Sequence, residues 1–98
     1  MVKLTYNTQD ELNFLFKEEG NYEFSKIIVN KCLEMINTDF EELTIIEITV
    51  KDTDTIYDIA LMRSDIKETL EVNLPILIAE EDYELCSKVQ HAINNLFN

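Results

Sequence analysis

The strongest constraint on the fold of this chain is an alternation of apolar and polar residues that runs from Leu43 to Leu74. Because side chains of a strand alternate between two faces, a correct pairing of strands brings apolar residues opposite each other on one face. Turns at 52–55 and 64–67 satisfy this requirement for three strands. The shared face then consists of Ile46, Ile48, Val50, Tyr57, Ile59, Leu61, Leu70, Val72 and Leu74.

This pattern predicts an antiparallel three-stranded meander. The predicted pairs of the first hairpin are Val50 with Tyr57, Ile48 with Ile59 and Ile46 with Leu61, and those of the second are Leu61 with Leu70, Ile59 with Val72 and Tyr57 with Leu74. Pro75 is expected to end the third strand, because proline has no N–H to give to the ladder. Residues 2–6 also alternate, which predicts a short fourth strand at the edge of the sheet.

Apolar residues spaced three and four apart predict helices in the rest of the chain. The predicted helices cover residues 8–19, 22–37 and 79–97. Thr8 and Glu11 have the spacing of a capping box, Gly20 suits the left-handed residue that closes a helix, and Asn21 suits the cap of the next one. The acidic residues 80–82 suit the positive end of the last helix. We therefore expect an α+β fold with its helices packed on one face of the sheet.

Composition and charge narrow the function classes. The 98 residues suit a single domain over 1–98, and 46% hydrophobic content is typical of a folded chain. A net charge of -12 disfavours direct binding to nucleic acid or to an anionic membrane. Cys32 and Cys86 fall at core-like helical positions and suit free thiols in a reducing compartment. No run approaches the ~20 apolar residues of a membrane span, so the cytoplasm is the expected location.

Catalytic and metal-binding patterns are weak. His91 and Cys86, five positions apart on a predicted helix, point in different directions around its axis. Asp52 and Asp54 lack the glycine and the closing glutamate of a calcium loop and fit a hairpin turn instead. We therefore expect no enzyme, no cofactor and no metal ion.

One stretch of the last helix resembles a known motif. Residues 82–89, Asp-Tyr-Glu-Leu-Cys-Ser-Lys-Val, followed by Ile93, resemble the second half of the UVR motif, a helical hairpin of nucleotide-excision-repair subunits, although Gln90 and His91 replace its usual Arg-Asp. This resemblance implies a protein-binding helix. The size, acidity and α+β make-up are also similar to those of small phage inhibitors of host defence, such as anti-CRISPR and anti-restriction proteins.

Two functional hypotheses remain: one follows from the net charge and the lack of a catalytic set, and the other follows from the open face of the predicted sheet. The first is an acidic domain that acts as a nucleic-acid mimic and blocks a basic nucleic-acid-binding surface on a partner protein. Its candidate residues are Asp39, Glu41, Glu42, Glu47, Asp52, Asp54, Asp58 and Glu71. The alternative is a structural or assembly module that forms a homodimer through apolar residues on that face. Its candidate residues are Ile45, Ile56 and Met62.

Overall fold

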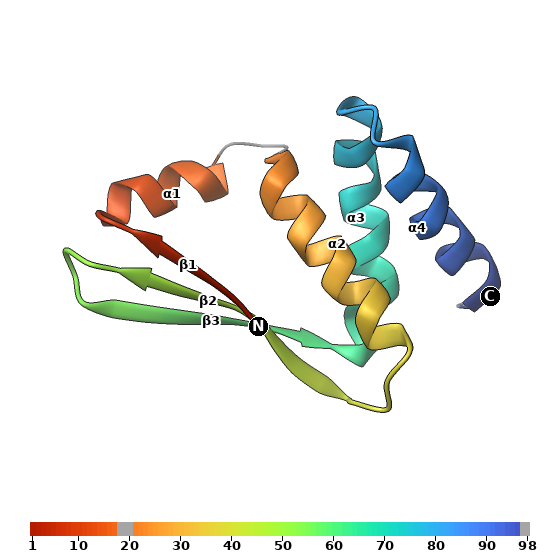
Figure 1. Ribbon diagram of the computed structural model, residues 1–98, viewed down its shortest axis with the longest axis horizontal. Helices are drawn as coiled ribbons and strands as arrows, with labels where there is room; N and C mark the ends of the chain where they lie inside the picture. Colours follow the sequence, from red (N-terminus) through yellow and green to blue (C-terminus); the bar gives the residue numbers. More distant parts are fainter. Residues whose placement is uncertain (18–20, 97–98) are drawn as a thin grey trace.

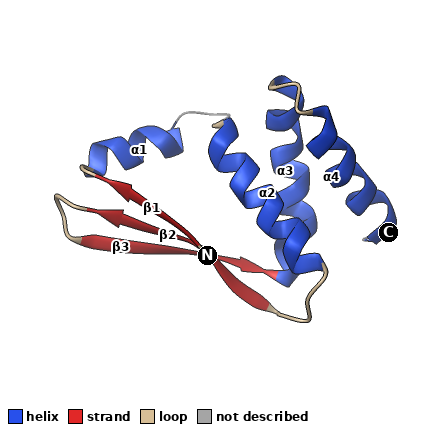
Figure 2. Ribbon diagram, in the orientation of Figure 1, coloured by secondary structure: helices blue, strands red, loops and turns tan. Residues whose placement is uncertain are grey.

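The computed structural model describes residues 1–17 and 21–96, which form a three-stranded sheet and four α-helices (Figure 1). The strands are β1 (Val2–Tyr6), β2 (Glu42–Val50) and β3 (Thr55–Met62). The helices are α1 (Gln9–Lys17), α2 (Tyr22–Ile36), α3 (Ile66–Ala79) and α4 (Tyr83–Leu96), and a short 3-10 turn, η1 (Arg63–Asp65), precedes α3. Figure 2 shows the helices on one side of the sheet, so the predicted α+β class is confirmed.

The central strand is β2, which pairs in parallel with β1 and antiparallel with β3. The predicted edge strand at residues 2–6 is therefore confirmed, whereas the antiparallel meander is wrong. The physical reason is the connection between β1 and β2. Figure 1 shows α1 and α2 carrying the chain from the end of β1 back past its start, so that β2 runs in the same direction as β1. Parallel neighbours require a crossover of this kind.

The β2–β3 hairpin is offset by two residues from the predicted register. The observed pairs are Val50 with Thr55, Ile48 with Tyr57 and Ile46 with Ile59, in place of the predicted Tyr57, Ile59 and Leu61. Because an offset of two residues keeps every side chain on its face, alternation alone does not distinguish the two registers. The turn decides between them. Asp54 has a left-handed backbone (φ 50°), and its N–H donates to the Lys51 carbonyl over 3.3 Å. The turn therefore ends at Asp54, and β3 begins at Thr55 opposite Val50.

A β-bulge changes the face on which one predicted residue lies. The pairing shifts between Thr44 and Ile46, so Ile45 is the extra residue in β2. Ile45 is only 2% exposed and lies in the core beside Ile46. The prediction that Ile45 faces solvent is wrong, because a bulge interrupts the alternation from which that prediction came.

The predicted third strand is helix α3 in the structure. Leu70, Val72 and Leu74 alternate as in a strand, but Ile66, Leu70 and Leu77 also share one face of a helix. The structure buries the second set and leaves Val72 64% exposed. Helix α3 packs between α2 and α4 and covers the apolar stripes of both helices. If this segment were a third strand, only the sheet could cover those stripes.

The start and interior of α3 also differ from the prediction. The 3-10 turn and the first residues of α3 occupy the predicted turn at 64–67. Pro75 lies inside α3 and ends no strand. A proline there removes the donor for the carbonyl of Glu71, four residues earlier. Both residues lie on the exposed side of the helix, where water reaches that carbonyl.

The first two helices begin at their predicted caps. The Thr8 hydroxyl accepts from the Glu11 N–H over 3.2 Å, but the Glu11 carboxylate accepts from the N–H of Asn7, one residue before the position that a capping box requires. Helix α2 begins where Asn21 accepts from the N–H of its third helical residue over 2.9 Å. The predicted helices over 8–19 and 22–37 are thus confirmed over α1 and α2. Gly20 lies outside the described residues.

The last predicted helix starts four residues later than expected. Helix α3 ends in a Schellman-type turn, in which the Asp82 N–H donates to the Leu77 carbonyl over 3.0 Å and Glu81 is left-handed (φ 59°). Asp82 then caps α4 by accepting from the Leu85 N–H over 3.3 Å. Glu80 and Glu81 therefore lie at the negative end of α3, and not at the positive end of a helix as predicted.

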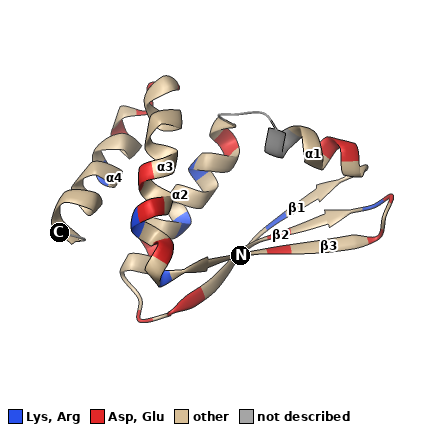
Figure 3. Cartoon of the chain, turned by 180° about the vertical axis from the view of Figure 1, so that it is seen from behind, with Lys and Arg blue, Asp and Glu red and all other residues tan. Residues whose placement is uncertain are grey.

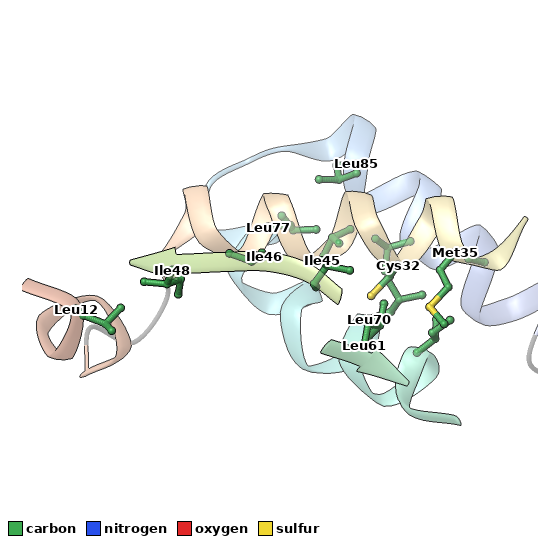
Figure 4. Close-up of a cluster of buried hydrophobic side chains, with 14 of the residues drawn as sticks. Leu12, Cys32, Met35, Ile45, Ile46, Ile48, Leu61, Leu70, Leu77 and Leu85 are labelled. Atoms are coloured by element: carbon green, nitrogen blue, oxygen red, sulfur yellow. The ribbon is translucent and has the colours of Figure 1, made fainter. Parts of the chain in front are cut away.

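One continuous apolar core joins the sheet to the helices. In Figure 4, Leu12 of α1 lies beside Ile48 at one end of the sheet, while Cys32, Met35 and Leu70 gather at the other. Both cysteines are free thiols, of which Cys32 is buried and Cys86 half-buried. The Cα atoms span 44 × 31 × 17 Å, so the molecule is flat and has a large surface for its volume. The side of the sheet away from the helices is left uncovered.

Candidate protein-binding surface

The uncovered side of the sheet presents a row of three charged residues. Lys3 of β1 lies beside Glu47 of β2, and Glu47 lies opposite Asp58 of β3. We call this side the open face, and its residues are Lys3, Thr5, Glu47, Thr49, Ile56, Asp58 and Ala60. All of these residues are exposed or half-buried. The open face is therefore polar, with acidic side chains at its centre.

Glu47 and Asp58 are a pair of carboxylates that form no ion pair among the described residues, although Lys3 of β1 lies beside Glu47. Like charges directly opposite each other on neighbouring strands are destabilising, by up to about 1 kcal/mol. The ion pairs formed among the described residues join Lys31 to Glu34 and Lys88 to Glu84, all on helices. Neither Glu47 nor Asp58 is thus part of an ion pair among the described residues, and the basic residue of the open face, Lys3, lies on the Glu47 side of the pair only.

Further carboxylates follow the same hairpin. The hairpin carboxylates are Glu42, Glu47, Asp52, Asp54 and Asp58. At a rise of about 3.3 Å per residue, the strand from Glu42 to Val50 is about 26 Å long. Figure 3 shows the acidic residues distributed along the hairpin from its tip to the loop before β2. The hairpin thus presents a line of negative charge and not a single compact patch.

The tip of the hairpin meets the start of α1. The Asp52 carboxylate accepts from the Gln9 N–H over 3.2 Å, which brings Asp10 and Glu11 next to the tip. Asp52 therefore has a structural role that the sequence pattern did not reveal. Asp10 and Glu11 add to the acidic tip and were absent from the predicted set, because α1 meets the hairpin only in the tertiary structure.

At the other end of the hairpin, a loop carries Asp39 and Glu41 into β2. The Arg63 side chain forms no ion pair with either of them among the described residues and instead donates to backbone carbonyls, including that of Phe40 at 2.8 Å. The Arg63 N–H donates to the Glu41 carbonyl over 2.8 Å and fixes the loop. Both carboxylates are exposed. Seven of the eight predicted partner-binding residues thus lie on the hairpin or this loop, whereas Glu71 lies on α3 and not on the sheet.

The predicted self-association residues do not form one surface. Ile45 is buried at the bulge, so it takes no part in an exposed apolar centre. Ile56 and Met62 are 63% and 42% exposed but lie at opposite ends of β3, roughly 20 Å apart at the strand rise. Between them on the same face are the acidic Asp58 and the small Ala60. The structure therefore removes the apolar centre on which the dimer hypothesis depended.

A separate hollow of about 220 Å³ lies between α2 and α4. The Tyr22 hydroxyl donates to the Asp82 carboxylate over 2.7 Å, and this bond raises the pKa of Tyr22 to about 12 and lowers that of Asp82. Lys26 lies over the Tyr22 ring at 5.7 Å from its centroid. The hollow is also lined by Lys88 and Glu84, which pair with each other. Its charges are internally balanced, which contrasts with the hairpin.

The described thiols and imidazole are not arranged as an activated nucleophile. Burial raises the pKa of the Cys32 thiol to about 12, and burial and the Asp82 carboxylate also raise that of Cys86. A reactive cysteine needs a lowered pKa. His91 is exposed, and its Nδ1 lies 3.2 Å from the side-chain amide of Asn95. Among residues 1–17 and 21–96, no group of three or more His, Cys, Asp or Glu is placed to hold a metal ion.

Comparison with known protein families, with characterised proteins and with solved structures gives no match. Within the described part of the chain, no helix is both long and apolar enough to cross a bilayer. The UVR-type resemblance of residues 82–93 stays a prediction. Those residues form the cap and most of α4, whose Leu85, Val89 and Ala92 are buried in the core.

Proposed function

We propose that this chain is a non-enzymatic, acidic protein-binding domain that blocks a basic, nucleic-acid-binding surface on a partner protein. It would act in the cytoplasm as a phage-type inhibitor or nucleic-acid mimic. One observation carries the proposal: Glu47 and Asp58 lie opposite each other on an uncovered sheet face, without an ion pair among the described residues. A basic partner would relieve that repulsion, so the unfavourable arrangement in the free domain becomes favourable in the complex.

The line of hairpin carboxylates also suits a partner that normally binds a nucleic acid. A basic groove that tracks a phosphate backbone carries positive charge over tens of ångströms, and the acidic hairpin extends over about 26 Å. With a net charge of -12, the domain would be drawn to such a groove before contact. Because charges are screened over roughly 8 Å at physiological ionic strength, both the rate of association and the affinity are expected to fall as salt is added.

The test compares two variants of equal charge. The hairpin variant carries Glu42→Lys, Glu47→Lys and Asp58→Lys, and the control variant carries three reversals on or beside α3: Glu68→Lys, Glu71→Lys and Glu80→Lys. Each replacement adds two positive charges, so three change the net charge from -12 to -6 in both proteins. None of the six side chains has an ion pair among the described residues. The two variants therefore differ in where the charge was changed and not in how much.

Each protein is immobilised and exposed to cell lysate at low and at high salt, with and without added double-stranded DNA. We expect the unmodified domain and the control variant to capture a basic nucleic-acid-binding protein at low salt, and added DNA to displace it. The hairpin variant is expected to lose this capture. If the hairpin variant captures the same protein with the same salt dependence, the proposal is wrong.

A further inference from the structure

Strand β3 is an accessible edge of the sheet. Within the described residues its strand neighbour is β2, on one side. Every second residue of an edge strand directs its N–H and C=O away from the sheet, where another chain can pair with them. Strand β3 has eight residues against five in β1, and most of them are exposed. The exposed residues are Ile56, Tyr57, Asp58, Ala60 and Met62.

The two faces of β3 would contact different kinds of side chain in an added strand: apolar on the helix side and basic on the open face. On the helix side, Tyr57 is 41% exposed and Ile59 is half-buried, so the apolar layer of the sheet stays partly uncovered at this edge. On the open face, Asp58 lies beside Glu47. A strand added to β3 would therefore pack apolar side chains on Tyr57 and Ile59 and place basic side chains beside Asp58. Because strand side chains alternate, one segment does both when basic and apolar residues alternate.

A second copy of the chain fits this edge poorly. A two-fold axis that joins two β3 strands edge to edge keeps both open faces on the same side, so residues of like face lie opposite each other. At the largest overlaps, Asp58 then lies opposite its own copy or on the diagonal, about 7–8 Å away. Strand β3 contains no basic residue to offset this repulsion. Each copy also brings a net charge of -12.

We infer that β3 binds an extended segment of the basic partner by strand addition, and that this segment alternates Lys or Arg with apolar residues. The inference rests on the proposed function and deepens it, because it states which element of the domain holds the partner and in what conformation. Main-chain hydrogen bonds to the free edge supply affinity in this mode, and the alternating side chains supply specificity. Binding through charge alone would need neither the edge nor the alternation.

The test uses the full chain and three fluorescent peptides of about ten residues, in which Lys alternates with Val or Ile. One peptide is unmodified, and the other two are N-methylated at alternate residues, either odd or even, which removes the backbone donors of one peptide edge without changing the charge. We expect one methylated peptide to bind about tenfold more weakly than the unmodified one, which is the loss of about 1.4 kcal/mol of hydrogen bonding. The other methylated peptide is expected to bind nearly as well as the unmodified one.

Two further measurements locate the binding site. Hydrogen exchange is expected to slow at alternate amides of β3 when the unmodified peptide is bound, and to stay unchanged in β1. Asp58→Lys is expected to weaken peptide binding by roughly threefold or more, as expected for a reversed cross-strand ion pair. Glu71→Lys, which makes the same charge change on α3, is expected to leave it unchanged.

The outcomes separate strand addition from the proposed function. If both methylated peptides bind as well as the unmodified one, or if protection falls outside β3, strand addition is wrong while a charge-based complex remains. If the unmodified peptide fails to bind at low salt, the inference is also wrong, and the lysate capture decides the proposed function independently. If sedimentation shows a dimer whose β3 amides are protected without peptide, a second copy occupies the edge and the inference fails.

Discussion

Arg63 closes the end of α2, and its removal tests how that end is stabilised. Its Nε donates to the Phe40 carbonyl over 2.8 Å, and its Nη2 donates to the carbonyls of Met35, at 3.1 Å, and Thr38. The last carbonyls of a helix have no partner within the helix, so they need donors from elsewhere. A cation at this position also opposes the negative end of the helix dipole. One side chain therefore joins α2 and the loop before β2 to the end of β3.

The size of the effect follows from which carbonyls lose their donor. A hydrogen bond from a charged group contributes about 1.5–3 kcal/mol, but part of it is recovered where water can replace the donor. The Phe40 carbonyl belongs to an exposed residue and can be hydrated, and the Met35 carbonyl keeps the N–H and hydroxyl of Thr38 at 3.0 and 2.8 Å. The third acceptor of Arg63 is the Thr38 carbonyl, and the loss of this bond accounts for most of the expected effect. We therefore expect Arg63→Met to lower the free energy of unfolding by about 2 kcal/mol. Arg63→Lys should recover a part, because an ammonium does not span three carbonyls.

The assay is urea denaturation followed by far-ultraviolet circular dichroism. The matched control is Lys67→Met, which removes an exposed cation nearby and is expected to change the unfolding free energy by less than about 0.5 kcal/mol. Since the acceptors of Arg63 are uncharged carbonyls, the loss should be similar in low and high salt. A loss below about 0.5 kcal/mol for Arg63→Met would refute the reasoning. A loss that vanishes in high salt would show instead that Arg63 acts through the acidic loop.

Three further predictions concern the helices. Glu81→Gly should raise the unfolding free energy by about 1 kcal/mol, because Glu81 has a left-handed backbone (φ 59°) that glycine adopts without strain. Glu80→Gly, at φ -86°, should lower the unfolding free energy, and equal effects of the two changes would contradict this explanation. Asn73→Leu should lower the unfolding free energy by about 1–3 kcal/mol, because it removes the acceptor of the buried Ser25 hydroxyl, which donates to Asn73 over 2.7 Å. Adding Ser25→Ala should restore much of this free energy, as measured by urea denaturation. The pKa of Tyr22 is about 12, above its ordinary 10.0, so its bond stabilises the fold below pH 10 and is lost as pH rises through 12. If the unmodified protein shows more phenolate absorbance near pH 10 than the Tyr22→Phe variant does, the pKa of Tyr22 is not raised.

The helix boundaries show how much local chemistry can predict. Asn21 is a strong cap followed by a long apolar stripe, and α2 starts and ends within one residue of its predicted range. The last helix begins later than predicted, because the chain makes a Schellman turn at Glu81, a residue that rarely adopts a left-handed backbone. Caps that use common residues can thus be found in a sequence, whereas a turn formed by an uncommon residue cannot.

The acidic surface was predictable in part. Glu47 and Asp58 were placed on the uncovered face by alternation alone, since the two-residue error in register did not change their face. Glu71 was misplaced with its whole segment. Asp10 was missed, because its closeness to the hairpin tip depends on a bond from Gln9 to a carboxylate 43 residues away. Residues separated by that distance along the chain are brought together only by folding.

By itself, the sequence determined the α+β class, the edge strand at residues 2–6, the first two helices and the strongly negative charge. These features follow from local caps, from side-chain periodicity and from counting charges, none of which needs a distant partner. Only the tertiary structure decided that Ile66–Ala79 is a helix, that β1 runs parallel to β2 and that a bulge buries Ile45. Within Ile66–Ala79, both a strand and a helix would bring apolar residues onto one face. The helix prevails because it lies between α2 and α4 and covers the apolar stripes of both.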